Sequence, residues 1–209
     1  MDTPLTRGWI ARVASTIADQ ADYLTQLDSA IGDADHGVNM NRGFAAVTEV
    51  LAEYEATTVG DLLVRVGATL VSRVGGASGP LYGTAFRAMG KELATPTVDS
   101  AQLVAALRAG LAALQKLGAA VPGDKTIVDA YLPAIEALEA AVNAGEALPA
   151  AAAAAASAAQ EGMRSTIPMQ ARKGRASYLG PRSVGHQDPG ATSTWLIFRS
   201  LAEATAAGR

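Results

Sequence analysis

Apolar residues recur three and four positions apart along nearly the whole chain, and this spacing restricts the fold more than any other feature. One such series is formed by Trp9, Val13, Ile17, Ala21 and Leu24. Because an α-helix completes a turn in 3.6 residues, each series predicts a helix with one buried face. Period-two alternation, the pattern of a half-buried strand, is not evident, so the sequence predicts an all-α fold.

The same spacing predicts further helices. A second series covers residues 40–54 and a third covers 59–70, where Thr58 and Asp61 have the spacing of a capping box. We therefore expect a single domain, residues 1–209, built as a barrel of about eight antiparallel helices joined by short connections. The remaining helical stretches cover 80–94, 99–117, 126–143, 149–168 and 190–207.

Composition excludes several classes of protein. The chain has no cysteine, which rules out disulfides and cysteine-ligated zinc or iron–sulfur sites, and it has only two histidines. Hydrophobic residues make up 49%, which suffices for a proper core, and alanine supplies much of that share. The 17 basic and 20 acidic residues give a net charge of −3, which argues against a nucleic-acid partner. Neither a signal peptide nor a membrane-spanning segment is evident, so we expect a cytoplasmic protein without a membrane partner.

Glycine is concentrated in four of the connections between the predicted helices. These segments are 32–37, 75–80, 118–123 and 174–190. Loops that only join helices do not need so many glycines, whereas loops that press their backbone against a ligand do. The four segments are therefore the candidates for a functional site.

Three aspartates lie within eight residues at the first of these segments. They are Asp28, Asp33 and Asp35, and no basic residue follows before Arg42. Such a cluster is electrostatically costly unless a cation neutralises it, and Mg²⁺ prefers carboxylate oxygens as ligands. An EF-hand loop begins in a similar way, but Phe44 stands where its final glutamate is required. The aspartates could hold one or two Mg²⁺ ions, or they could cap helices and fill turns.

Two further segments could offer backbone groups to a ligand. Within 75–80, Ser78 could cap the next helix, whose first N–H groups would then face a phosphate; a plain turn is the alternative. Residues 118–126 nearly imitate a P-loop, but Asp124 replaces the P-loop lysine and no strand precedes it, which excludes that motif. This turn could still border a nucleotide, or it could only cap a helix.

A basic segment precedes the last predicted helix. Five basic residues lie from Arg164 to Arg182, and no acidic residue occurs between Glu161 and Asp188. In a chain of net negative charge this is a focused positive patch that suits a phosphate or a nucleotide. A solvated loop is the alternative, and Tyr178, its one aromatic residue, argues against RNA.

A carboxylate cluster, glycine-rich loops and a basic segment in one chain together predict a site for a magnesium-bound nucleotide. Phosphoryl transfer depends mainly on positioning and on neutralising charge. Such a site therefore requires no side-chain nucleophile, and the sequence predicts none.

Four motifs carry a resemblance to a known family. They are Gly-Asp-Ala-Asp-His-Gly at 32–37, Gly-Gly-Ala-Ser-Gly-Pro at 75–80, Gly-Asp-Lys-Thr at 123–126, and Ala-Arg-Lys-Gly-Arg-Ala-Ser-Tyr-Leu-Gly at 171–180 followed by Gly-His-Gln-Asp-Pro-Gly-Ala at 185–191. In this order they resemble the nucleotide-binding L subunit of dihydroxyacetone kinase, and the likeness covers nearly the whole chain.

The resemblance implies an all-α barrel of eight antiparallel helices, with ADP or ATP and two Mg²⁺ ions at one end. It implies Asp28, Asp33 and Asp35 as the metal ligands. The residues implied as neighbours of the nucleotide are His36, Gly37, Val38, Asn39, Ala77, Ser78, Gly118, Ile127, Arg175, Asp188, Pro189 and Gly190.

The chain looks like the subunit of the phosphotransferase-system type, which implies two protein partners. Bound ADP would accept a phosphoryl group from a phosphohistidine donor protein, and the resulting ATP would phosphorylate dihydroxyacetone held by the K subunit. Neither His36 nor His186 would need to be phosphorylated. The chain alone should not turn over.

Two other functions stay open on the sequence. The nucleotide could exchange freely in an ATP-dependent kinase for dihydroxyacetone or a similar small ketose such as erythrulose. Alternatively, Mg-ADP could be a structural ligand in a regulatory module that docks on another protein. The rate of nucleotide exchange separates the first alternative from the resident carrier, and phosphoryl transfer separates the second.

Overall fold

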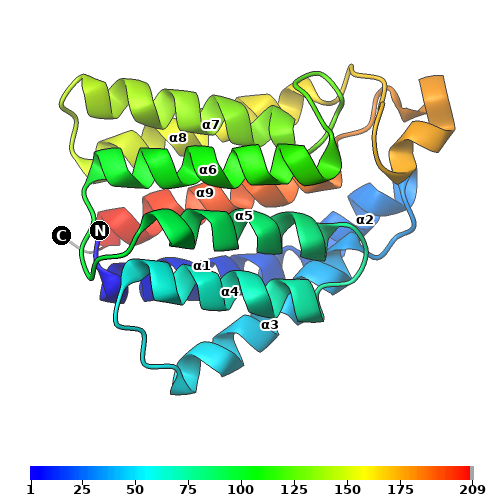
Figure 1. The fold of residues 1–209 in the computed structure, drawn as a ribbon. Coiled ribbons are helices and arrows are strands. Elements are labelled where there is room, and N and C mark those ends of the chain that lie inside the picture. The colour runs from blue at the N-terminus through cyan, green and yellow to red at the C-terminus, as the bar shows by residue number, and fades with distance from the viewer. Residues whose placement is uncertain (208–209) are drawn as a thin grey trace.

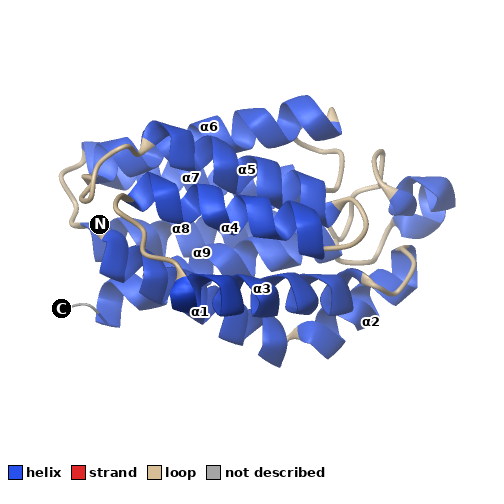
Figure 2. Ribbon diagram, turned by 60° about the horizontal axis from the view of Figure 1, so that its bottom comes forward, coloured by secondary structure: helices blue, strands red, loops and turns tan. Residues whose placement is uncertain are grey.

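A computed structural model describes residues 1–207, and the elements that it shows are helices joined by loops (Figures 1 and 2). The all-α prediction is confirmed. No helix in this range is both long and apolar enough to cross a membrane. The elements are α1 (Thr3–Asp19), α2 (Ala21–Ile31), α3 (His36–Glu53), α4 (Val59–Arg73), α5 (Ser78–Glu92), α6 (Ser100–Gly118), α7 (Ile127–Asn143), α8 (Leu148–Ser165), the 3₁₀-helix η1 (Arg175–Ser183) and α9 (Pro189–Ala207).

Eight of the α-helices close into a ring. Each helix from α3 to α8 packs against the next in the chain, α9 packs against α1, and α1 packs against α3. The remaining helix, α2, continues from the end of α1 and packs mainly against α3 (Figure 1). The barrel of about eight helices expected from the sequence is therefore present, with α2 added at one end.

The direction of the helices decides where the connections lie. Because successive helices run in opposite directions around the ring, every second connection returns to the same end of the barrel. The connections 32–35, 74–77, 119–126 and 166–188 gather at the end opposite the N-terminus and the end of α9 (Figure 1). These four connections contain the glycine-rich motifs that the sequence singled out.

One predicted series differs from the observed helices. The residues from Trp9 to Leu24 share one apolar stripe, but the helix is interrupted at Gln20, whose φ of −106° and ψ of 7° leave the helical range. Its N–H donates to the carbonyls of Thr16 and Ala18 and closes α1, after which α2 begins at once. Trp9 and Leu24 are both buried, so the break changes the helix direction but keeps the stripe inside.

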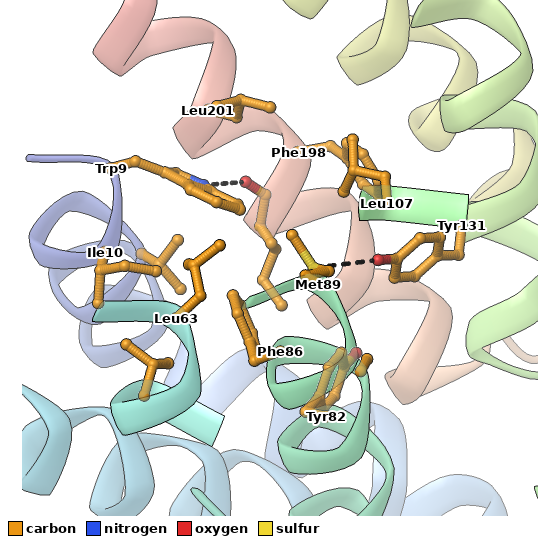
Figure 3. Packing of buried hydrophobic residues seen from close by; sticks show 14 of the residues in the cluster. Trp9, Ile10, Leu63, Tyr82, Phe86, Met89, Leu107, Tyr131, Phe198 and Leu201 are labelled. Atoms are coloured by element: carbon orange, nitrogen blue, oxygen red, sulfur yellow. Dashed lines mark hydrogen bonds between the residues drawn. The ribbon is translucent and has the colours of Figure 1, made fainter. Parts of the chain in front are cut away.

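The core combines a few aromatic rings, which Figure 3 shows among aliphatic side chains, with many small side chains. The ring of Trp9 lies 6.0 Å from that of Phe86, and Tyr131 meets Phe198 edge-on at 5.3 Å. Trp9 also donates its indole N–H to the carbonyl of Ile197 at 3.1 Å, which ties α1 to α9. Small buried side chains let α8 lie close to α7 and α9; they include Ala151, Ala152, Ala155 and Ala159.

Candidate functional site

The four connections enclose a cavity of about 900 Å³ at their end of the barrel. That volume lies within the range that small-molecule and nucleotide pockets occupy. Residues from every one of the four connections line it, together with the last turn of α6 and the first turns of α3, α5, α7 and α9. A ligand there would touch chain segments that are far apart in the sequence.

The aspartate cluster forms one wall of this cavity. Asp28 lies in the last turn of α2, and its Oδ2 atom accepts hydrogen bonds from the backbone N–H groups of Asp35 at 2.9 Å and His36 at 3.1 Å. Gly32 follows the last residue of α2, and a Cβ at that position would overlap the Asp28 carboxylate. One oxygen from each of Asp28, Asp33 and Asp35 lies within 4.8 Å of the others. The structure therefore brings the three expected metal ligands together.

A cation from the fourth connection already lies against this cluster. The Nε atom of Arg175 is 2.6 Å from the Oδ2 atom of Asp33. Both side chains are largely solvent-accessible, at 69% and 39%, so the ion pair contributes little to the stability of the fold. It does show that Arg175 reaches the aspartates from another connection.

His36 is the first residue of α3 and is held by two hydroxyl groups. Its Nδ1 atom lies 3.1 Å from the Oγ atom of Ser78, and its Nε2 atom lies 2.9 Å from the Oγ atom of Ser193. Burial lowers the pKa of His36, against the opposing charges of Asp28 and Asp35. The ring is therefore neutral near pH 7, with one nitrogen available to accept a hydrogen bond.

The hydroxyl of Tyr82 extends the hydrogen-bonded network of His36 and Ser193 into the barrel. It lies 2.7 Å from the Oγ atom of Ser193 and 2.8 Å from the Oγ1 atom of Thr194, and it donates to the carbonyl of Gly190 at 3.0 Å. Burial raises the pKa of Tyr82 far above its ordinary value, so the hydroxyl keeps its proton. The apolar spacing of α5 gave no reason to expect a polar role for this tyrosine.

The start of α5 differs from the predicted cap. Ser78 is the first residue of the helix, and Ala77 occupies the N-cap position without a side-chain hydrogen bond. The Ser78 hydroxyl turns to His36 instead. Because no side chain caps α5, its first N–H groups remain available to an anion in the cavity. Gly76 supports the turn before them with a φ of +63°, a conformation that favours glycine.

The third connection caps a helix and also lines the cavity. Thr126 caps α7 in a capping box with Asp129, whose Oδ2 atom accepts the N–H of Thr126 at 2.7 Å. Thr126 and Ile127 also line the cavity. Gly190 at the start of α9 lies so close that a Cβ there would meet the Cγ1 atom of Ile127 at 3.0 Å.

Asp188 precedes the first residue of α9 and is buried at the back of the cavity. Its Oδ2 atom accepts the N–H of Ala191 at 2.7 Å, as an N-capping side chain does. Burial raises its pKa to about 7, and the charges of Asp129 and Asp28 add to the effect, while the Ala191 hydrogen bond and Lys125 oppose it. Asp188 is therefore poised to change its charge near neutral pH.

The basic segment is more ordered than a solvated loop. Residues 175–183 form the 3₁₀-helix η1, with an irregular residue at Gly180, where φ is +54°. The hydroxyl of Ser183 is buried, accepts the N–H of Ala171 at 2.9 Å and donates to the carbonyl of Gly180 at 2.7 Å. These bonds fold residues 171–183 into a hairpin that projects from the end of the barrel (Figure 1).

Most of the expected nucleotide neighbours line the cavity. Those that do are His36, Ala77, Ser78, Gly118, Ile127, Arg175, Asp188, Pro189 and Gly190. Three expected neighbours lie outside its wall, and they are Gly37, Val38 and Asn39. The structure brings the first group together from four separate connections.

The three residues outside the wall have other contacts. Gly37 faces the carbonyl of Ala21 so closely that it allows α2 and α3 to cross. Val38 points to solvent with 57% of its surface exposed. Asn39 is buried and accepts a hydrogen bond from Arg42 at 2.8 Å, beside the connection that leads to α5.

Sequence reasoning missed several lining residues. Lys125, Arg172 and Lys173 belong to motifs that were singled out, but no role was assigned to them individually. The apolar lining residues carried no signal, because core and pocket residues look alike in a helical stripe; they include Ile31, Leu81, Leu114 and Leu117.

Comparison with known proteins identifies the family. A family model described as the DAK2 domain matches residues 30–203. The chain belongs to the DAK2 family. The DAK2 chain is 47% identical over 195 residues to the ADP-binding subunit DhaL of the PEP-dependent dihydroxyacetone kinase of Escherichia coli (strain K12), with 93% of each chain covered. It is 40% identical over 198 residues to the ADP-binding subunit DhaL of the PTS-dependent dihydroxyacetone kinase of Lactococcus lactis subsp. lactis (strain IL1403), with 95% of each covered.

A solved structure has the same fold as the DAK2 chain. The crystal structure of the dihydroxyacetone kinase from C. freundii in complex with AMP-PNP and Mg²⁺ superimposes with a TM-score of 0.76 at 29% identity. The match covers 97% of the DAK2 chain but 34% of the C. freundii chain, so the DAK2 chain spans about a third of that kinase. The all-α barrel is therefore the family fold.

Proposed function

We propose that this chain is the ADP-binding subunit of a dihydroxyacetone kinase of the phosphotransferase-system type, and that residues 1–209 act as one nucleotide-binding domain. The observation that carries the proposal is the cavity lined by three clustered carboxylates, with Arg175 in contact with one of them. The 47% identity to an ADP-binding subunit from Escherichia coli supports the same function.

Asp28, Asp33 and Asp35 would hold the metal. Mg²⁺ is bound by carboxylate oxygens together with phosphate oxygens and water, and three carboxylates within 4.8 Å of one another supply that donor set. We propose two ions at this cluster, and in known two-metal sites such ions lie about 3.5–4 Å apart. The relative from C. freundii, solved with AMP-PNP and Mg²⁺, supports a metal–nucleotide complex.

The surrounding backbone and side chains would hold ADP or ATP. The uncapped start of α5 at Ala77 and Ser78 offers N–H groups to a phosphate. Ile127 offers an apolar surface for the base, beside Gly190. The full set that we propose is His36, Gly37, Val38, Asn39, Ala77, Ser78, Gly118, Ile127, Arg175, Asp188, Pro189 and Gly190, with the first helical turn of α3 acting through its backbone.

The residues of the cavity position and neutralise charge, and none of them needs to form a covalent bond. When bound, Mg-ADP would supply the β-phosphate oxygen that accepts a phosphoryl group from a partner's phosphohistidine, and the group would then pass to a hydroxyl of dihydroxyacetone. Arg175 would leave Asp33 and place its guanidinium on the transferring phosphoryl group. The walls formed by α5, α7 and α9 would limit the access of water.

The partners that we propose are a dihydroxyacetone-binding K subunit and a phosphohistidine donor protein. Two exposed large apolar side chains, Leu117 and Tyr178, line the cavity, and exposed apolar side chains are typical of protein interfaces. Other exposed large apolar side chains among the described residues are Tyr23, Val38, Val71, Val121, Ile167 and Val184. Both partners would have to reach the same nucleotide in the cavity.

A second candidate is a kinase that exchanges ATP freely or acts on another small ketose. It is favoured by the 39% identity over 194 residues to the D-erythrulose kinase of Mycolicibacterium smegmatis, of which this chain covers 33%. A regulatory module that only docks with Mg-ADP bound is a third possibility. The three functions differ in what they require for phosphoryl transfer.

Reconstitution distinguishes them. The protein is loaded with Mg-ADP, dialysed, and mixed with a phosphoenolpyruvate-charged phosphohistidine donor, a K subunit and dihydroxyacetone, without free nucleotide. Many product molecules per chain support the resident carrier. Product that forms only with added ATP overturns the carrier in favour of the exchanging kinase, and binding without any transfer favours the regulatory module.

A further inference from the structure

Lys125 lies in the wall of the cavity, but its ammonium group is turned into the protein. Only 1% of the residue is exposed. Its Nζ atom donates hydrogen bonds to the carbonyls of Ser183 at 2.6 Å, His186 at 2.5 Å and Met169 at 3.1 Å. None of the ion pairs among residues 1–207 includes this lysine.

The three hydrogen bonds use the whole donor capacity of the ammonium group. A lysine has three N–H donors and no acceptor, so no donor remains for a phosphate in the cavity. Burying a charge is costly unless its hydrogen bonds are satisfied, and three carbonyls satisfy this one. Burial lowers the pKa of Lys125, and the negative charge of Asp188 opposes that shift.

The backbone conformation of Lys125 indicates that its side chain contributes to holding this turn. Lys125 has a φ of +63°, in the left-handed region where glycine or asparagine is favoured. A residue other than glycine stays in this conformation only where its other contacts compensate for the conformational energy. Glycine would fit the backbone better, so the ammonium and its three carbonyls must compensate for the strained turn.

All three carbonyls belong to the connection between α8 and α9. Met169 precedes the hairpin that contains η1, and Ser183 and His186 lie at its other end, so Lys125 binds both ends of the hairpin. The neighbouring turn adds one more contact, because the N–H of Arg172 donates to the carbonyl of Asp124 at 3.1 Å. The third connection therefore fixes the fourth at several points.

We propose that Lys125 is a positioning residue, whose buried ammonium fastens both ends of the basic hairpin so that Arg175 and Asp188 face the cavity. The proposal rests on the proposed function for the importance of that placement to nucleotide binding. No basic residue of the hairpin is itself buried, and its other contacts with the rest of the barrel include a small apolar cluster of Ile31, Ala171 and Ala176 and the exposed Arg175–Asp33 ion pair. Without the ammonium, the three carbonyls would lose their shared partner, and only these weaker contacts would hold the hairpin in place.

The absence of cysteine from the sequence permits a direct test. Lys125→Cys creates the only thiol, and alkylation with bromoethylamine in denaturant, followed by refolding, restores an ammonium on a side chain of lysine-like length. Alkylation with iodoacetamide gives a neutral side chain of similar size. Lys91→Cys, treated in the same ways, is the control, because Lys91 is exposed in the last turn of α5 at the opposite end of the barrel.

Two readouts are measured on each form. Hydrogen exchange of the amides of Ala171, Arg172 and Gly185, which bond within or beside the hairpin, is followed without nucleotide. In Lys125→Cys we expect exchange at least about tenfold faster, since hydrogen bonds to a charged group are lost. We also expect at least about tenfold weaker binding of Mg-ADP, because Arg175 and Asp188 are no longer held.

Recovery of both readouts by the aminoethyl adduct, but not by the neutral adduct, is the expected result. Equal recovery by both adducts, or unchanged exchange in Lys125→Cys, would overturn the proposal. If Lys125→Cys does not fold, refolding only as the aminoethyl adduct gives the expected answer, and refolding as either adduct contradicts it. Failure of the unmodified protein to bind Mg-ADP would contradict the proposed function. Hydrogen exchange would then still test whether Lys125 holds the hairpin.

Discussion

The guanidinium of Arg175 lies 2.6 Å from the carboxylate of Asp33 and joins the fourth connection of the barrel to the first. A divalent cation at the aspartates would compete with Arg175 for the same carboxylate. Its arrival would then free the guanidinium for the phosphates that accompany the metal. The ion pair thus places the metal ligands and the phosphate-binding cation within reach of one ligand.

Removing the Arg175 side chain tests this arrangement. Arg175→Ala should slow phosphoryl transfer about 100-fold, as the loss of one charge-stabilising donor does in other enzymes. Because the side chain is 69% exposed, the free energy of unfolding should change by no more than about 0.5 kcal/mol. Transfer rates with saturating partners and thermal unfolding of the same preparation measure the two effects.

Arg182→Ala provides the matched control, since Arg182 belongs to η1 and is exposed but does not line the cavity. It should leave transfer nearly unchanged. Equal losses in the two variants would mean that only the total charge of the hairpin matters, and unchanged transfer in Arg175→Ala would place this residue outside the reaction.

The aspartate cluster makes a separate prediction. Asp33→Ala should weaken the retention of Mg-ADP by more than about 100-fold, the upper limit for changes that act only through the surroundings of a metal ligand. Helicity should be largely unchanged, because Asp33 lies between α2 and α3 and its ion pair is solvent-accessible. Titration calorimetry and circular dichroism measure both. Asp22→Ala, an exposed acid of α2, should bind normally; a metal assignment to Asp33 does not survive if the two variants bind alike.

Asp188 predicts how stability depends on pH. Its folded pKa of about 7 exceeds the ordinary value of 3.8, so between these values the folded state binds a proton that the unfolded state has released. The contribution is complete below about pH 4 and is lost as the pH rises through 7, a change on the order of 4 kcal/mol. In the absence of metal and nucleotide, the stability of Asp188→Asn should not fall in this way as the pH rises. Unfolding curves from pH 4 to 8 compare the two proteins, and parallel pH profiles would show that Asp188 is ionised throughout.

A substitution of Gly37 tests how much the close crossing of α2 and α3 contributes to the stability of the fold. A Cβ at Gly37 would overlap the carbonyl of Ala21, so Gly37→Ala should destabilise the protein by about 1–3 kcal/mol. Gly8→Ala is the control, because nothing lies within 4 Å of that position in α1, and it should stabilise by about 1 kcal/mol. Chemical denaturation measures both changes. A neutral Gly37→Ala would show that the two helices can separate without cost.

The helices and the clustering of the three aspartates were predictable because their signals are local. The spacing from Trp9 to Leu24 reports one buried face directly, and three aspartates between residues 28 and 35 need only one tight helix end to bring their carboxylates together. The break at Gln20 was not predictable, since both halves keep the same apolar stripe. A stripe records which face is buried and does not record where the axis bends.

The contacts between one connection and another could not be predicted from the sequence. Lys125 stands in a turn for which the sequence left two uses open, beside a nucleotide or as a helix cap, but the three acceptors of Lys125 are backbone carbonyls more than forty residues later, and carbonyls carry no sequence signal. Ser78 was expected to cap α5 and instead bonds to His36, which arrives from another connection. The resemblance placed Val38 beside the nucleotide, but its side chain points to solvent, because a motif names neighbours without telling backbone from side-chain contacts.

A native mass spectrum of the purified protein in Mg²⁺, before and after extended dialysis, tests the central claim most directly. The account predicts a mass increase of one ADP and two Mg²⁺ that survives dialysis, as a resident phosphoryl carrier requires. Nucleotide that binds only when added and then washes out would contradict the resident carrier and favour the ATP-exchanging kinase. The absence of any nucleotide mass in excess Mg-ADP would contradict the site itself.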